Sequence, residues 1–240
     1  YGIPTDLPLV VQVSRFDHWK DPVGVIRAFE KARRKEECTL VLVGNVATDD
    51  PEGAEVYRSL LAHRNERVIV LSVQDGALVN ALQRRAAVVM QKSLREGFGL
   101  TVSEAMWKGA VVIGGDVGGI RYQIQDGVNG FLVSSVDEAA ERIVRLLRDP
   151  DLAERLGRAA RERVRECFLF ALKASAAYTL AVTLCTQLFP ELFFRLFNAD
   201  VDLLTAGAPA LRLYFSMFYM LTLQIAGQYA FVALGQSRQA

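Results

Sequence analysis

Two glutamates that stand eight residues apart, Glu96 and Glu104, lie within the segment of the chain richest in residues that could do chemistry, REGFGLTVSEAMWKG. Between them lies a Gly-Phe-Gly turn, whose Gly97 and Gly99 let a ligand come close to the backbone. The turn leads into a predicted helix, and the free amides and positive dipole end of that helix favour a phosphate. Glu104 lies one helical turn further on, where it can accept hydrogen bonds from a pair of sugar hydroxyls. The segment therefore predicts a phosphate site with a sugar beside it.

A second group of charged residues, SRFDHWKDP, follows the first predicted strand. Its Arg15 and Lys20 would place two cations where a diphosphate leaving group would lie. Simpler readings stay open for each residue, because Arg15 and Lys20 taken singly look like ordinary surface charges. Glu104 taken alone also fits a capping box, Thr101-x-x-Glu104, in which it would only stabilise the start of its helix.

The elements that must position these residues alternate between short apolar runs and amphipathic segments. The expected strands are Leu9–Val13, Thr39–Gly44, Val68–Leu71, Ala87–Gln91 and Val111–Gly114, and the expected helices between them are Val23–Lys35, Ala54–Arg64, Gly76–Arg85 and Leu100–Lys108. Nearly continuous apolar strands imply burial on both faces, so we expect a mainly parallel sheet with helices on each side. In such sheets ligands bind beyond the carboxyl ends of the strands, where both charged segments lie.

After this pattern, Ser135 and Glu138 form a predicted capping box that opens a helix running to about Arg148. Asp149-Pro150 ends that helix, and a second helix rich in Arg and Glu is expected to reach Glu166.

Other classes of ligand find little support in the sequence. The first 167 residues carry 24 basic and 24 acidic side chains, so we expect no nucleic-acid partner. His18 and His63 lack partners at metal spacing, so no metal is expected. The glycines of GGDVGGI lack the G-x-G-x-x-G spacing of a dinucleotide site. Three scattered cysteines, Cys38, Cys167 and Cys185, fit a reducing compartment, and we expect residues 1–168 to be cytoplasmic.

These residues resemble the donor-binding half of family 4 retaining glycosyltransferases of the GT-B fold, and among them the trehalose glycosyltransferring synthases. The resemblance covers residues 1–168. It rests on the E-x7-E element of Glu96 and Glu104, on the pair Arg15 and Lys20, and on the stretches QVSRFDHWKDPVGVI, VATDDPEG, NALQR, QKSLREGFGLTVSEAMWKG and DGVNGFLV.

The resemblance implies a Rossmann-like domain that binds NDP-glucose for retaining glucosyl transfer and needs no cofactor. Glu96, Arg15 and Lys20 would be the catalytic residues, with the two cations on the diphosphate and Glu96 near the transferred glucose. Glu104 would meet the ribose, and backbone near Val73 and Gln74 the base. The full implied donor site is Arg15, Lys20, Val73, Gln74, Glu96, Gly97, Phe98, Gly99, Leu100, Thr101 and Glu104.

In enzymes of this family a preceding Rossmann-like domain carries the sugar acceptor, and catalysis takes place in the cleft between the two domains. The chain opens on YGIPTDLPLVV, an extended lead into a strand, which is typical of a sequence entered in mid-protein. We therefore expect a fragment that binds the donor but does not turn it over alone, because half a cleft cannot align donor and acceptor.

From residue 168 onward the composition changes. Only seven charged residues follow Cys167, and two uncharged runs stand out, the 17 residues between Lys173 and Glu191 and the 22 residues of Leu213–Leu234. A run of 22 is long enough to cross a bilayer, and 17 is at the short limit. We expect residues 169–240 to form an apolar, membrane-type α-helical hairpin whose partners are lipid or other membrane helices.

Pro190 is expected to end the first of these helices and Asp200 to cap the next. Polar residues within the second run, such as Thr222 and Gln224, predict a face that packs on other helices. The region resembles a two-helix piece of the multidrug and toxic-compound extrusion (MATE) transporters. A change of family within one chain favours a junction of two unrelated reading frames, as in a misassembled or truncated gene. The alternatives are a membrane anchor for a sugar-nucleotide-binding enzyme domain, a buried soluble hairpin, and a transporter fragment.

Overall fold

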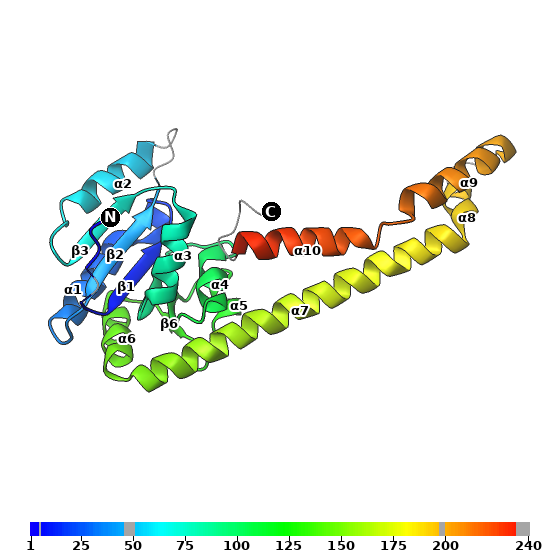
Figure 1. Cartoon of the computed structure of the whole chain (residues 1–240). Helices are drawn as coiled ribbons and strands as arrows, with labels where there is room; N and C mark the ends of the chain where they lie inside the picture. Colours follow the sequence, from blue (N-terminus) through cyan, green and yellow to red (C-terminus); the bar gives the residue numbers. More distant parts are fainter. Residues whose placement is uncertain (5, 46–50, 197–199, 234–240) are drawn as a thin grey trace. The chain divides into compact units, whose positions relative to one another are not determined.

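The computed structural model describes the chain except residues 5, 46–50, 197–199 and 234–240 (Figure 1). By its internal contacts the chain divides into two compact units, Tyr1–Arg165 and Glu166–Ala240. The two units are described separately below.

The first unit is built on six parallel strands in the order β3-β2-β1-β4-β5-β6. Their bounds are Leu9–Val13 (β1), Thr39–Gly44 (β2), Val68–Ser72 (β3), Val88–Gln91 (β4), Val112–Gly115 (β5) and Phe131–Val133 (β6). The parallel α/β prediction is confirmed, and the ends of the five expected strands move by at most one residue. The sixth strand, within the motif DGVNGFLV, was not predicted, because three residues are too short to show a pattern.

A helix or helical turn follows each strand. These elements are the 3-10 turn η1 (His18–Lys20), α1 (Pro22–Arg33), α2 (Pro51–Leu61), α3 (Gly76–Arg85), α4 (Leu100–Trp107), α5 (Ile120–Gln123) and α6 (Val136–Arg148). The predicted cap of α6 forms, with Ser135 Oγ accepting from the Glu138 amide at 3.1 Å. The Glu138 carboxylate reaches back to the amide of Ser134 at 2.7 Å, one residue earlier than in the usual capping box.

Both faces of the sheet are buried, as the continuous apolar strands predict. Val11 of β1 lies in register with Val41 of β2 and Val89 of β4, so their side chains share one face. That face is covered by residues of α3, α4 and α5, whereas α1, α2 and α6 pack on the opposite face. Neither face of the sheet is therefore open to a ligand. Ligands can bind only at the ends of the strands, and the loops at the carboxyl ends decide what binds there.

One predicted boundary is wrong. Helix α7 spans Pro150–Leu188 and continues through Glu166, where we expected it to stop. Nothing between Gly157 and Leu188 can end a helix, since that stretch contains no further glycine or proline. Pro190 does end it, as predicted, and opens α8 (Pro190–Arg195) at its first position.

The second unit consists of the distal part of α7, α8, α9 (Val201–Phe215) and α10 (Met220–Ala233). Asp200 caps α9 as predicted, with Oδ1 accepting from the amides of Asp202 and Leu203 at 2.9 and 3.1 Å. The expected continuous helix over Leu213–Leu234 is wrong. Residues 216–219 form a tighter turn, with amide-to-carbonyl bonds three residues back, between α9 and α10. Leu234 itself lies outside the described residues.

Helix α10 returns beside α7 within this unit (Figure 1), and the buried hydroxyls of Thr179 and Thr222 lie 2.9 Å apart. Thr222 thus packs on another helix, as its polar character predicted. In the described part of the chain, α7 alone is long and apolar enough to cross a membrane, a test that some core helices of soluble proteins also pass. Only 11% of its most apolar window is buried, however. Many large apolar side chains of the unit are also exposed, among them Phe170, Tyr178, Leu184, Leu188, Leu213 and Tyr214.

The arrangement of the core predicts that the first unit is stable without the second. All residues of the three buried clusters lie between Ile3 and Val164, so deletion of residues 169–240 removes none of them. We expect the shortened chain to be more soluble and to keep its melting temperature. Tryptophan fluorescence measures this directly, because Trp19 and Trp107, the two tryptophans of the chain, both lie in the first unit. A marked fall in melting temperature would contradict the prediction.

Candidate active site

The loop after β1 is held in place by buried polar contacts. Gln12 donates from Nε2 to the Lys20 carbonyl at 2.8 Å, and the Lys20 amide donates to Asp17 Oδ1 at 3.1 Å. Asp21 adopts a left-handed conformation, with φ of 47°, and accepts the Gly24 amide at 3.0 Å to cap α1. These contacts fix the backbone of Lys20 at the carboxyl edge of the sheet.

A second connection ties this loop to the one that follows β4. The buried Lys92 forms an ion pair with Asp21, and the Leu94 amide donates to the Trp19 carbonyl at 2.7 Å. The guanidinium of Arg95 stacks over the Trp19 ring at 4.2 Å. The two loops that carry the predicted site residues therefore form one structure.

At the centre of that structure Lys20 pairs with Glu96. The distance from Lys20 Nζ to Glu96 Oε2 is 2.5 Å, and the two side chains are only 17% and 11% exposed. The reading of Lys20 as an ordinary surface charge is therefore wrong. Arg15 differs, since its side chain is 67% exposed and lies 3.3 Å from Asp17.

The Gly-Phe-Gly turn leads into α4 as expected, but the helix starts without a capping box. Gly99, with φ of 84°, occupies the cap position, and no side chain hydrogen bonds there. The alternative in which Glu104 serves as the partner of Thr101 in a capping box is therefore wrong. Glu104 is half-buried one turn into α4. Burial lowers the pKa of the nearby Lys108, while the charge of Glu104 opposes that shift and that of Arg84 adds to it.

The segment GGDVGGI supports this turn from behind. Gly119 donates its amide to the Gly97 carbonyl at 2.8 Å. A Cβ on Gly118 would lie 1.8 Å from the Glu96 carbonyl oxygen, and one on Gly119 would lie 2.4 Å from that of Gly97. Gln123 donates from Nε2 to the carbonyl of Phe98. The glycines of this segment thus allow two backbones to touch, which is a different use from binding a dinucleotide.

A pocket of about 310 Å³ opens between the two loops, and it is lined by Ser14, Arg15, Lys20, Gln91, Glu96, Phe98, Gly99, Leu100 and Thr101. Seven of the eleven predicted donor-site residues belong to this lining. Gly97, Val73, Gln74 and Glu104 do not. The Val73 amide is already paired with the Gly44 carbonyl at 2.8 Å.

Ser14 and Gln91 are the two lining residues that the sequence reasoning missed. Ser14 directly follows the buried apolar strand β1, and Gln91 is the last residue of the buried apolar strand β4. Their position at the carboxyl end of a strand was the signal that could have found them. The two strands are neighbours at the point where the strand order changes direction, the usual place of a ligand in a doubly wound sheet.

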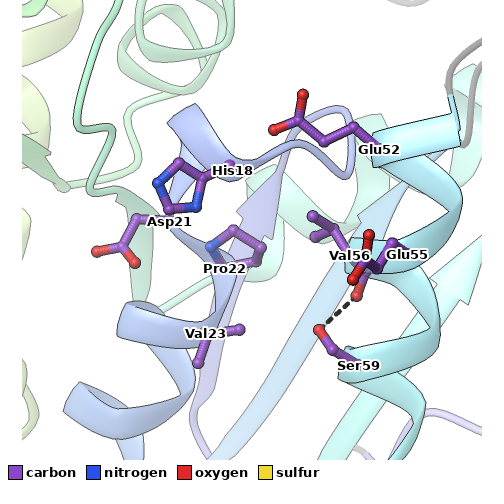
Figure 2. Close-up of a pocket in the computed structure, with 8 residues that line it drawn as sticks. All are labelled: His18, Asp21, Pro22, Val23, Glu52, Glu55, Val56 and Ser59. Atoms are coloured by element: carbon purple, nitrogen blue, oxygen red, sulfur yellow. Dashed lines mark hydrogen bonds between the residues drawn. The ribbon is translucent and has the colours of Figure 1, made fainter.

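A second hollow, of about 340 Å³, lies between the start of α1 and helix α2 (Figure 2). Its lining is acidic, with Asp21, Glu52 and Glu55 around His18. The Ser59 hydroxyl at its wall donates to the Val56 carbonyl at 2.7 Å. Asp21 is paired with Lys92, but the negative charges of Glu52 and Glu55 would repel a diphosphate, so this hollow does not suit the predicted donor. Within the described residues, no group of three or more acidic, His or Cys side chains is placed to hold a metal ion.

Comparison with known proteins gives a consistent picture for the first unit. The family profile described as glycosyl transferases group 1 matches residues 1–163. Trehalose synthases from Pyrococcus horikoshii and Rubrobacter xylanophilus are each 45% identical over 175 residues, which cover 70% of this chain and 42% of theirs. The chain thus spans less than half the length of these relatives.

Solved structures agree in fold. Sucrose-phosphate synthase from Thermosynechococcus elongatus is 33% identical, with a TM-score of 0.61 over 68% of this chain and 42% of its own. Anabaena HepE, determined in complex with UDP-glucose, has a TM-score of 0.59 at 24% identity over 67% of this chain and 44% of its own. At that identity HepE supports the fold alone.

The glycine support can be tested by two alanine substitutions that both place a side chain at positive φ. Gly118 and Gly127 both have positive φ, 45° and 72°, but a Cβ on Gly127 would meet nothing within 4 Å. We expect Gly118→Ala to lower the free energy of unfolding by roughly 1–3 kcal/mol more than Gly127→Ala, the usual cost of forcing atoms into filled space. Urea unfolding followed by tryptophan fluorescence measures both variants. Equal losses would show that Gly118 does not support the Glu96 turn.

Proposed function

This chain belongs to the glycosyl transferases group 1 family, and on that premise we propose that residues 1–168 bind the nucleotide-sugar donor of a retaining glucosyltransferase of the trehalose-synthase type. The observation that carries the proposal is the joining of Lys20, Glu96 and the start of α4 in one pocket at the carboxyl edge of the sheet.

The charges of the pocket suit a diphosphate. Lys20 and Arg15 supply positive charge, and the uncapped start of α4 adds amide donors and the positive end of a helix dipole. Lys20 is already paired with Glu96, but an ammonium group has three protons and can bridge a carboxylate and a phosphate. As the bond from the glucose anomeric carbon to the diphosphate breaks, these groups stabilise the negative charge that develops on the leaving oxygen. In this proposal the cations of the chain do the work, and no metal ion or cofactor is needed.

The size of the pocket divides the donor into parts. Pockets for drug-sized ligands usually measure about 300–1,000 Å³, so about 310 Å³ fits the glucose and phosphates rather than the whole nucleotide. We propose that glucose lies beside Glu96 and that backbone amides of Phe98–Thr101 meet the sugar and phosphate. The nucleoside then extends along the sheet edge, with Glu104 on the ribose and the base near Val73 and Gln74. Since its amide is taken, Val73 can offer the base only its carbonyl or side chain.

The acceptor sugar is proposed to bind in the part of the relatives that this chain does not cover, and we do not expect the chain alone to form the product. The UDP-glucose in HepE makes UDP-glucose a reasonable first probe. For the second unit we propose association with lipid as a helix pair, because its large apolar side chains are exposed and no charged residue stands between Lys173 and Glu191. The MATE resemblance of this unit stays a prediction.

The donor assignment predicts how the chain binds nucleotides. The full chain, in mild detergent, should bind at least one of UDP-glucose, ADP-glucose, GDP-glucose and TDP-glucose. Calorimetry measures the affinity for each of them. Lys20→Ala should weaken the binding of the nucleoside diphosphate by about tenfold to a hundredfold, because a hydrogen bond to a charged group contributes roughly 1.5–3 kcal/mol. Lys31→Ala is the matched control, since Lys31 pairs with Asp137 on the surface. Absence of binding at millimolar ligand for all four bases would refute the assignment.

The two glutamates should separate by ligand. Glu104→Gln should lower the affinity for UDP and the affinity for UDP-glucose alike by about tenfold, because the ribose hydroxyls lose a charged hydrogen-bond acceptor. Glu96→Gln should keep the affinity for UDP unchanged and remove the preference for UDP-glucose over UDP. Glu141→Gln, an exposed glutamate on α6, serves as the control. If neither substitution changed any affinity, Glu96 would have only a structural role as the partner of Lys20.

A further inference from the structure

The carboxylate of Glu96 is held by more than its ion pair. Its Oε2 atom accepts from Lys20 Nζ at 2.5 Å, from Ser93 Oγ at 3.3 Å and from Gln91 Nε2 at 3.5 Å. Its Oε1 atom accepts from the Gly97 amide at 3.2 Å. Gln91 also donates to Ser93 Oγ at 3.3 Å, so the two neutral residues form a connected pair next to the carboxylate.

Gln91 holds this position at a cost to itself. The residue is 2% exposed at the end of β4, and its Oε1 atom has no hydrogen-bond partner among the described residues. Buried polar atoms without partners are rare, and each calls for a reason. The opposite orientation of the amide would turn Oε1 toward Glu96 Oε2 and set two acceptor oxygens against each other. The carboxylate therefore determines which way the amide faces.

The neutral pair of Gln91 and Ser93 matters because Lys20 would have to bind two anions, the Glu96 carboxylate and the donor diphosphate. Resting on the proposed function, in which Lys20 binds the donor diphosphate, we propose that Gln91 is a positioning residue for Glu96. Together with Ser93 it keeps the carboxylate aimed at the sugar while the ammonium of Lys20 turns toward the phosphates. Because both are neutral donors, they hold Glu96 without drawing the diphosphate away from Lys20. Gln91 thus acts on the sugar through Glu96, whereas the nucleotide is left to the two cations and α4.

The test is a cycle of substitutions in the full chain with two probe pairs, UDP-glucose and UDP, and ADP-glucose and ADP. Gln91→Met keeps the length of the side chain and removes its amide. We expect the ratio of nucleotide-sugar affinity to nucleotide affinity to fall by about tenfold, since a carboxylate loses one of its donors. The affinity for the nucleotide alone should be retained. In a Glu96→Gln background the same substitution should leave the ratio unchanged.

Gln83→Met is the matched control, because Gln83 is equally buried and its amide bonds Lys108, away from Glu96. Should Gln91→Met fail to fold, Ser93→Ala removes the other neutral donor and should lower the same ratio. An unchanged ratio, or an equal fall in the Glu96→Gln background, would overturn the positioning role.

A second measurement keeps this proposal separate from the donor assignment. In the ligand-free chain with ¹³C-labelled glutamate, the Glu96 carboxyl resonance is assigned by its loss in Glu96→Gln. Gln91→Met should move that resonance, and Gln83→Met should not. If the chain bound none of the probes, the donor assignment would fail, and a shifted resonance would still show that Gln91 holds Glu96. A resonance that stays in place would overturn the proposal whatever the chain binds.

Discussion

The ion pair between Lys20 and Glu96 is the contact on which the arrangement of the first unit's site depends. It joins residues 76 positions apart and lies largely away from solvent. Charges taken out of water must be paired and hydrogen bonded, so the loops after β1 and β4 are held in one relative position. The second ion pair between them, Lys92 with Asp21, follows from the same constraint, and the stacking of Arg95 over the exposed Trp19 adds a contact at the surface. A ligand that attracts Lys20 therefore acts on a structure that is already assembled.

The second constraint is steric. The turn that carries Glu96 lies directly against the segment after β5, and side chains at Gly118 or Gly119 would occupy the space of backbone atoms. Close backbone contact leaves the turn little freedom, while within the turn a Cβ on Gly97 would meet nothing within 4 Å. Rigid support behind and open backbone in front is the combination that a site for phosphates needs, because the amide groups must be fixed before the anion arrives.

The two units solve different problems of burial. In the first unit a sheet covered on both faces collects the apolar residues, and the charged residues remain at the edges and on the outer helix faces. In the second unit apolar residues extend around the helices, and contacts such as that between Thr179 and Thr222 bury only part of them. Helix α7 belongs to both, and its sequence changes from charged to apolar without any residue that stops a helix. Composition thus changes along this helix where secondary structure does not.

The sequence alone determined the elements of the first unit, because periodicity, caps and helix breakers are local signals. Five strands, the cap at Ser135, the stop at Pro190 and the cap at Asp200 all followed from neighbouring residues. It also singled out Arg15, Lys20, Glu96 and the glycine turn as the residues with chemistry. The continuation of α7 beyond Glu166 was missed because a change in composition was taken for the end of a helix. The break after Phe215 was missed because a uniform apolar composition was taken for one continuous helix. Only the tertiary structure decided that Lys20 meets Glu96, that Gln91 supports it, and that Val73, Gln74 and Glu104 lie outside the pocket. These outcomes depend on strand order, which places β4 beside β1 across 74 intervening residues. Pairings between distant segments leave no local pattern in a single sequence.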